Sequence, residues 1–462
     1  MSIAADRIDQ KRDYYVSFAK AMWEEPETAY KEVKACRMTA RALEELGFTV
    51  ETGAYGLPTC VVGRYGSGKP VIGFLGELDA LPGMSQKCQT TKEPAVPGAP
   101  GQACGHNLLN TAALAAAAGA AAELKEKGLP GTVVFYGCPA EEELTGKSFM
   151  ARNGAFSELD AAYAWHGNRH NEVPVGKYTG LNSAIFHFTG RTAHAGGDPH
   201  NGRSGLDACE LMSVGANYLR EHVTSDVRIH YCYKEAGTAP NIVPDKGSVW
   251  YYVRALSREA VEDTYDRLVL VAKGAALMTQ TELEVEFLGG CYDTMPNLVL
   301  AEQTTRLMRS IGAPEWTAEE LEFADELNRT CSQYEALKAA GALAGGPMST
   351  GVLDPRPDIG YGSTDVGDVQ HIVPCIMVNT ATYDLAAAGH SWQIAACAGS
   401  SIGFKGMLFG AKVLAEAAVE LVEKPELLEA AKEEFKASMK GKTYKCPIPE
   451  GLPVPQPDGT KK

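Results

Sequence analysis

Short apolar runs alternate with segments of helical spacing along the first 180 residues. The apolar runs are CVVGRYG (60–66), VIGFLGELDALPG (71–83), GTVVFYGC (131–138) and DAAYAWHG (160–167). Helical patterns follow Asn107 and cover 147–153. Continuous apolar strands that alternate with helices are typical of a mostly parallel sheet covered on both faces. The pattern therefore predicts an α/β fold.

The pattern changes near Leu181. Six segments follow in the order strand, helix, strand, strand, helix, strand: 184–190, 206–223, 227–233, 247–256, 259–278 and 282–287. This βαββαβ order is that of the split βαβ, or ferredoxin-like, module. We expect it to form an inserted domain at 181–297, between the two segments of a first domain at 1–180 and 298–462.

The remaining segments return to the α/β pattern. They are helical patterns at 298–311, 318–342 and 401–440, a strand at 374–384, and a Gly/Pro-rich loop at 343–362. The tail at 441–462 is Pro-rich and polar, so we expect no regular structure there.

Composition and charge exclude several classes of partner. The chain has 462 residues, 45% of them hydrophobic, and a formal net charge of −15 without a basic stripe, which argues against a nucleic-acid partner. The longest apolar run, 111–124, is rich in alanine and too short to span a bilayer, and the N-terminus lacks the pattern of a signal peptide. We expect a cytoplasmic protein without a membrane partner.

Chemically capable side chains gather where the predicted strands end. Ligands of an open α/β sheet bind outside the carboxyl ends of its strands. The residues that follow the strands, or precede the helix at the same edge, are Glu77, Asp79, Cys104, His106, Glu141, Glu142, Glu143, His166 and His390. Thiolate, imidazole and carboxylate groups from separate strands fit a transition-metal site better than a catalytic triad.

Each of these residues alone has an ordinary explanation. The acidic run 141–143 would by default be a solvated helix N-terminus, and Cys104 a small core residue. A cysteine-nucleophile amidase is a further alternative, in which Cys104 attacks and His106 or His166 acts as the base. That alternative leaves Glu142 and His390 without a purpose, and resistance to chelation would distinguish it.

Several motifs in the same order resemble a known family over nearly the whole chain. They are GELDALPG, GAPGQACGHNLLNTAALAAA, FYGCPAEE, AAYAWH, TGRTAHAGGDPHNGRSGLDA, APNIVPD, STDVGDV and HSWQ. These motifs are similar to those of the aminoacylase and carboxypeptidase-type dinuclear metallopeptidases. The resemblance is greatest to the branch that acts on p-aminobenzoyl-glutamate, since Asn107 follows the CGH motif where the indole-acetyl-amino-acid branch usually has Asp.

The resemblance implies two divalent metal ions, zinc or manganese, in each chain. The implied metal ligands are Cys104 as a bridging thiolate, His106, Glu142, His166 and His390. Glu141 corresponds to the general base, and Asp79 to the acid that orients a ligand histidine, here His106. Glu77 takes a position where many relatives have a metal histidine, and we leave it outside the ligand set.

The inserted domain resembles the lid and dimerisation domain of the family. There, His194 matches a histidine that reaches the partner's active site, where it would stabilise the oxyanion, and Asn241 would lie beside it. Arg254 matches an arginine that binds the free carboxylate of the substrate in some relatives. The resemblance thus implies a homodimer, with a hetero-oligomer containing a related subunit as the alternative.

The implied activity is hydrolysis of the amide bond of N-acyl or N-aroyl amino acids. The first candidate substrate is p-aminobenzoyl-glutamate. A dipeptidase, or another N-acyl-amino-acid hydrolase of the same family, is the alternative. A catalytically silent partner subunit is a weaker one, because all five ligand positions and the base position are filled.

Overall fold

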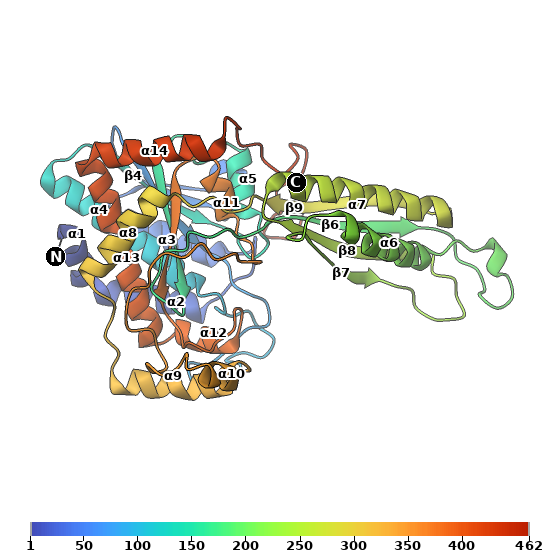
Figure 1. The fold of residues 1–462 in the computed structure, drawn as a ribbon, viewed down its shortest axis with the longest axis horizontal. Coiled ribbons are helices and arrows are strands. Elements are labelled where there is room, and N and C mark those ends of the chain that lie inside the picture. The colour runs from blue at the N-terminus through green and yellow to red at the C-terminus, as the bar shows by residue number, and fades with distance from the viewer. Residues whose placement is uncertain (1, 461–462) are drawn as a thin grey trace.

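The computed structural model describes residues 2–460 and has two parts (Figure 1). The larger part contains a six-stranded sheet and most of the helices. A narrower part projects from it, consists of residues 180–291, and is called the arm below. The predicted domain boundaries at 181 and 297 lie close to the limits of the arm and stay a prediction.

The strands of the larger part are β1 (Thr49–Thr52), β2 (Val61–Ser67), β3 (Val71–Glu77), β4 (Gly131–Cys138), β5 (Ala161–Asn168) and β10 (Cys375–Ala381). Its helices are α1 (Ile3–Gln10), α2 (Arg12–Glu24), α3 (Val33–Glu45), α4 (His106–Lys127), α5 (Gly146–Arg152), α8 (Leu298–Ile311), α9 (Ala318–Thr330), α10 (Tyr334–Ala339), α11 (Val366–Gln370), α12 (Trp392–Ala398), α13 (Ser401–Glu423) and α14 (Pro425–Met439). Two predicted helical stretches are each divided, 318–342 into α9 and α10, and 401–440 into α13 and α14. Pro425 begins α14, where its missing N–H costs nothing.

The sheet of the larger part has the strand order β1-β2-β4-β3-β5-β10. Strands β4, β3, β5 and β10 are parallel to one another, whereas β2 is antiparallel to β4 and β1 is antiparallel to β2. This confirms the predicted mostly parallel sheet. The carboxyl ends of four adjacent strands therefore lie at one edge.

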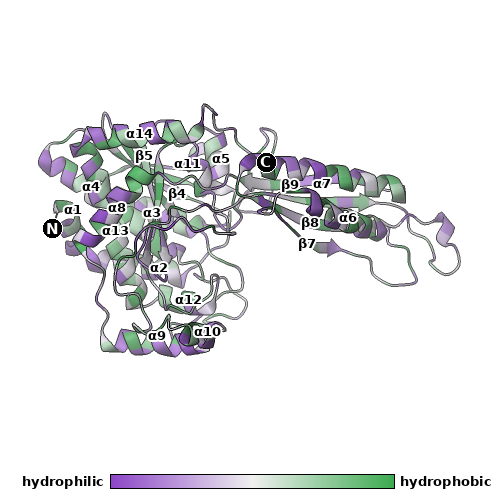
Figure 2. Cartoon of the chain, viewed as in Figure 1, coloured by the Kyte–Doolittle hydropathy of each residue, from purple (hydrophilic) through white to green (hydrophobic). Residues whose placement is uncertain are grey.

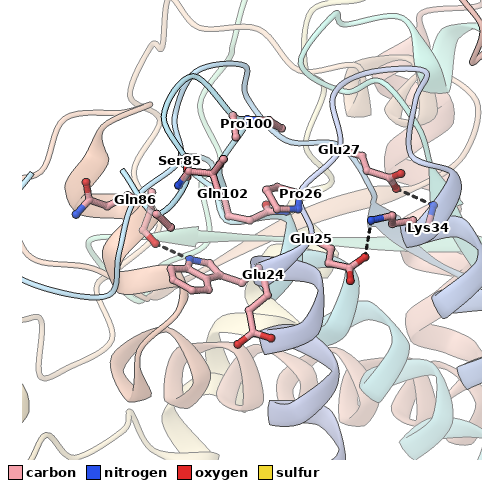
Figure 3. A pocket seen from close by; sticks show the side chains of 15 residues that line it. Glu24, Glu25, Pro26, Glu27, Lys34, Ser85, Gln86, Pro100 and Gln102 are labelled. Atoms are coloured by element: carbon pink, nitrogen blue, oxygen red, sulfur yellow. Dashed lines mark hydrogen bonds and ion pairs between the residues drawn. The ribbon is translucent and has the colours of Figure 1, made fainter. Parts of the chain in front are cut away.

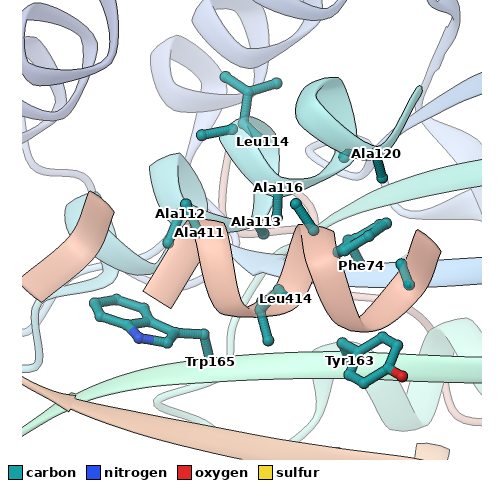
Figure 4. Packing of buried hydrophobic residues seen from close by; sticks show 14 of the residues in the cluster. Phe74, Ala112, Ala113, Leu114, Ala116, Ala120, Tyr163, Trp165, Ala411 and Leu414 are labelled. Carbon is teal, nitrogen blue, oxygen red and sulfur yellow. The ribbon is translucent and has the colours of Figure 1, made fainter. Parts of the chain in front are cut away.

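Apolar side chains fill both faces of this sheet. Adjacent residues of a strand, such as Phe74 and Leu75, belong to hydrophobic cores on opposite faces of the sheet. Burial on both faces explains why the strands are continuously apolar. On one face α4 and α13 lie against each other and against the strands, and their alanines allow a close approach (Figure 4). Figure 2 shows the hydrophobic residues concentrated in the inner strands, with hydrophilic residues frequent on outer helices such as α9.

The arm is a second sheet with two helices on one face. It contains β6 (Gly180–Thr189), α6 (Gly205–Leu219), β7 (Arg228–Glu235), β8 (Lys246–Ala255), α7 (Arg258–Thr279) and β9 (Glu282–Cys291). The sheet is antiparallel with the order β7-β8-β6-β9, and α6 and α7 bury their apolar sides against it. The predicted βαββαβ order is confirmed. Together the two sheets establish the predicted α/β architecture.

No single described helix is both long enough and apolar enough to cross a membrane. The pair α12 and α13, bent by 71° at a short break, meets the length and composition requirements together.

Candidate metal centre

Eight of the predicted site residues meet at the carboxyl edge of the parallel strands. Strands β3, β4 and β5 and the N-terminus of α4 contribute seven of them, and the loop between β10 and α12 contributes the eighth. The residues brought together are Glu77, Asp79, Cys104, His106, Glu141, Glu142, His166 and His390.

The turn into α4 explains the spacing of the CGH motif. Gly105 has a φ of +80°, in the left-handed region that favours glycine, and α4 begins at His106. The turn at Gly105 allows the side chains of its two neighbours, Cys104 and His106, to lie at the same site. Asn107 points away into the core, where its amide donates to the carbonyl oxygens of Ala19 and Ala398 at 3.1 and 3.0 Å.

Cys104 takes the central position in the cluster. Its Sγ lies 3.3 Å from Nε2 of His166. Two groups of candidate ligand atoms, each within 4.8 Å of one another, share this sulfur: one with His106 and His166, the other with Glu142 and His390. Nε2 of His390 lies 3.4 Å from Oε2 of Glu142. Cys104 is thus the residue that these two candidate ligand groups share.

Asp79 organises the surrounding backbone as well as a histidine. Nδ1 of His106 lies 3.0 Å from the Asp79 carbonyl oxygen and 3.2 Å from its Oδ1. The two carboxylate oxygens also accept the amide hydrogens of Glu141 at 3.2 Å and Glu142 at 2.9 Å. Burial opposes the charge, but these hydrogen bonds lower the pKa of Asp79. A charged Asp79 therefore fixes the orientation of His106.

Three buried atoms in the cluster make no hydrogen bond of good geometry with the described residues. They are Oε2 of Glu77, Nε2 of His106 and Oε1 of Glu142. An unpaired buried polar atom is costly, and here all three belong to candidate metal-ligand groups. The donor set of sulfur, imidazole nitrogen and carboxylate oxygen is one that binds transition metals.

The charge of the cluster also fits divalent cations. Burial raises the pKa of Glu142 to about 7. Burial, with the neighbouring charges of Glu77 and Asp365, raises the pKa of Glu141 well above its ordinary value. Burial likewise raises the pKa of the Cys104 thiol. Positive charge at this position would favour the ionised form of all three groups.

Lys147 is a functional candidate that the sequence analysis did not identify. It is fully buried, and its Nζ lies 2.6 Å from both Oε1 of Glu77 and Oδ1 of Asp365. The ammonium group fixes Glu77, whose other oxygen lies 3.2 Å from Nε2 of His106. Glu77, which the sequence analysis left outside the ligand set, thus joins His106 and Glu141 in a third candidate group.

A cleft of about 610 Å³ opens above the cluster, and both parts of the chain line it. The larger part contributes the cluster itself together with Arg169 and Tyr383, and the arm contributes Tyr252 and Arg254 from β8. Arg254 therefore lies where the resemblance predicts a substrate contact. Arg169 was not among the site residues predicted from the sequence, although it directly follows strand β5.

A second hollow, of about 350 Å³, is lined in part by residues 99–102, which lead to Cys104 (Figure 3). Its acidic side chains are partly paired: Oε2 of Glu25 lies 2.8 Å from Nζ of Lys34. Gln102 lines it, but no cysteine or histidine of the described chain does. It therefore has carboxylate oxygens but lacks the sulfur and imidazole donors of the cluster.

His194 and Asn241 do not line the cleft of their own chain. They lie in loops that follow β6 and precede β8, at the end of the arm away from the larger part (Figure 1). Both are exposed, and the amide of Ala195 donates to the carbonyl oxygen of Asn241 at 3.0 Å. The predicted proximity of His194 to Asn241 is present, whereas neither residue reaches the cluster within one chain.

Comparison with known proteins gives a consistent result. The model of peptidase family M20/M25/M40 matches residues 73–437. The chain is 36% identical to one of the subunits of p-aminobenzoyl-glutamate hydrolase from Escherichia coli, with 98% of each chain covered. It is 28% identical to mouse Xaa-Arg dipeptidase, covering 94% of this chain and 92% of the relative. A dinuclear metal-binding peptidase of the M20 family from Bacillus subtilis shares the fold, with a TM-score of 0.57 at 18% identity, covering 90% of this chain and 99% of that one.

Proposed function

The chain belongs to peptidase family M20/M25/M40 and is a metal-dependent hydrolase of amide bonds, and from this premise we propose that it cleaves N-acyl or N-aroyl amino acids. The first candidate substrate is p-aminobenzoyl-glutamate. The cluster of unpaired donor atoms around Cys104, at the base of a cleft, carries the proposal. The substrate is suggested by the relative in Escherichia coli, whose name states that activity.

The proposed metal ligands are Cys104, His106, Glu142, His166 and His390. When bound, two divalent ions lower the pKa of a water molecule and polarise the scissile carbonyl. The thiolate and imidazoles favour zinc, while the carboxylate also admits manganese. Asp79 supports the set because a hydrogen bond from Nδ1–H of His106 leaves Nε2 free to bind.

Glu141 is the proposed general base. It is buried at the edge of the cleft, with Oε2 3.8 Å from Nε2 of His106. A carboxylate in this position accepts the proton of the attacking water and passes it to the leaving nitrogen.

We also propose that the active enzyme contains more than one chain. His194 lies in the loop after β6 and does not line the cleft of its own chain, so a contribution to catalysis requires a second copy or a related subunit. The relative in Escherichia coli is by its name one subunit of a hydrolase. Edge strand β7 of the arm presents Tyr231 and Tyr233 to solvent, which offers an apolar surface for such a partner.

A cytoplasmic location is part of the proposal. All twelve cysteines are free in the described chain. A bridging thiolate at Cys104 requires that cysteine to remain reduced, which a reducing compartment favours.

The first experiment is elemental analysis of the purified protein, combined with p-aminobenzoyl-glutamate hydrolysis before and after chelation and metal return. We expect about two metal ions per chain and activity that is lost and restored with the metal. Activity that survives complete metal removal would instead support the cysteine-nucleophile mechanism. Metal binding without turnover would direct attention to dipeptides, which the similarity to Xaa-Arg dipeptidase favours as the second candidate, or to a missing subunit.

A further inference from the structure

Two arginines line the cleft away from the metal cluster. The family resemblance already implies that Arg254 binds the carboxylate next to the scissile amide, and we propose that Arg169 binds a second carboxylate, on the side chain of the leaving amino acid. The cleft would therefore select acidic amino acids such as glutamate or aspartate. This inference rests on the proposed function and deepens it.

The charges along the cleft point to this ligand. Acidic side chains line it only within the metal cluster, at Glu77, Glu141 and Glu142, among the residues described. Beyond the cluster, the fully charged side chains of the lining are Arg169 and Arg254. A substrate that fills the cleft would therefore contact the metal-binding groups with one part and the two guanidinium groups with another.

Arg254 has unused hydrogen-bonding capacity. One of its terminal nitrogens donates to Oγ of Ser363 at 2.9 Å, and its Nε is buried without a partner among the described residues. The ring of Tyr252 lies beside the guanidinium, 5.4 Å from its central carbon. These contacts hold the group in place, and its other terminal nitrogen has no acceptor among the described residues, so that nitrogen can donate to an incoming carboxylate.

Arg169 is positioned by the backbone of the larger part. Its amide donates to Oδ1 of Asn168 at 2.7 Å, and its guanidinium donates to the carbonyl oxygen of Ala387 at 3.1 Å. It comes three residues after His166 at the end of β5. Arg169 and the cluster line the same cleft. A substrate whose amide bond lies at the cluster can therefore direct a side-chain carboxylate toward Arg169.

Neither arginine has an acidic partner among the residues that the structure describes, although the chain has 58 acidic and 43 basic residues. Other arginines do have such partners, for example Arg306 with Glu420 and Arg329 with Asp325. Two unpaired guanidinium groups in one partly desolvated cleft are complementary to a dianion. The same groups would repel a leaving amino acid with a cationic side chain.

The experiment compares p-aminobenzoyl-glutamate with p-aminobenzoyl-glutamine, which differ in the charge of the side chain and release the same p-aminobenzoate. We expect wild-type protein to prefer the glutamate compound by about 10- to 100-fold in kcat/KM, the usual size of one charge-assisted contact. Arg169→Gln should abolish this preference, because it lowers kcat/KM for the glutamate compound far more than for the glutamine compound. Arg254→Gln should reduce kcat/KM for both compounds, and Arg41→Gln, on the exposed face of α3, should change neither.

Equal hydrolysis of the two compounds by wild-type protein, or an equal loss of both in Arg169→Gln, would overturn the inference. If neither compound is hydrolysed after metal return, p-aminobenzoyl-glutamate fails as the proposed substrate, and calorimetric binding of the same two compounds to the metal-loaded protein decides the arginine site separately. Tighter binding of the glutamate compound that Arg169→Gln removes would support the site. Equal or undetectable binding of both would overturn it.

Discussion

Asp384 is a buried acid in the loop that leads from β10 to His390. One of its oxygens accepts the amide hydrogen of Ala386 at 3.2 Å, and the other has no partner among the described residues. Burial raises the pKa of Asp384 from 3.8 to about 6. The folded chain therefore retains a proton here that the unfolded chain has already lost at the same pH.

This shift predicts how stability depends on pH. The stabilising contribution of the protonated group is fully present below pH 3.8 and is lost as the pH rises through about 6. Asp384→Asn should remove this loss and raise the free energy of unfolding at pH 7.5 by about 2 kcal/mol. Urea unfolding with a chelator present, at pH 4.5 and pH 7.5, measures it.

Asp358→Asn is the matched control, since the side chain of Asp358 is 79% exposed. A pH dependence that is the same in Asp384→Asn and wild-type protein would contradict the assignment.

The predictability of individual site residues depends on how local their signal is. Cys104, His106, Glu142 and His166 were predictable because each lies beside an apolar strand or a helix start. Lys147 was not, because its two partners lie 70 and 218 residues away in the sequence. In the sequence, Lys147 is only a single lysine near the start of a helix. Its role becomes evident when the fold brings Glu77 and Asp365 to it.

At the scale of elements, the site depends on how closely α13 packs on β5, the strand that contains His166. A Cβ atom added to Gly410 of α13 would lie 2.0 Å from Nε1 of Trp165. Trp165 is fully buried, and its Nε1 donates to Oγ1 of Thr380. The indole ring therefore has no room to move away.

Gly410→Ala should lower the free energy of unfolding by about 3 kcal/mol because of this overlap. Gly274→Ala in α7 is the matched control, since the added methyl group meets nothing within 4 Å. There the better helix propensity of alanine should raise stability by about 0.5–1 kcal/mol. Denaturant unfolding measures the free energy of unfolding of both variants. Equal changes in Gly410→Ala and Gly274→Ala would refute the packing argument.

The sequence predicted the strands better than the helix boundaries. Period and apolar content are strong signals in strands buried on both faces, so β2 to β5 and β10 were all expected. The break between α9 and α10 at Cys331 has no comparable signal, because the residues around it are compatible with a continuous helix. Helices α1 to α3 pack on other helices and on the sheet, and the α/β alternation does not single them out.

At the scale of the whole molecule, the arm holds two kinds of residue apart. Arg254 lies near the end of β8, in the cleft, whereas His194 lies in the loop after β6, at the opposite end of the sheet. Nδ1 of His194 accepts the amide hydrogens of Gly196 and Gly197 at 3.1 and 3.0 Å, which leaves Nε2 as the free nitrogen. With Nδ1 acting as the acceptor, Nε2–H of His194 can donate a hydrogen bond to the active site of a neighbouring chain.

Complementation between two inactive variants tests this contribution. His194→Ala and Glu141→Ala should each lose most activity, since one removes the donor and the other removes the base. Mixed oligomers of the two variants should recover roughly a quarter to a half of wild-type activity, because one site of each pair is then intact. Activity measured on separately tagged, co-purified chains gives the result.

His222→Ala provides the matched control, since His222 is also exposed on the arm. That variant should be fully active on its own. Verified mixed oligomers without recovery would refute a contribution of His194 across the interface.

Strands β5 and β10 pair in parallel although the arm is inserted between them. The register joins Cys375 to Ala162, across more than 200 positions of the chain. During synthesis the arm, whose strands pair only with one another, can fold as soon as residue 291 has emerged, before β10 exists. His390 comes later still, so the candidate group of Cys104, Glu142 and His390 is the last to be completed. We therefore expect full metal binding to follow closure of the larger sheet rather than the folding of its first half.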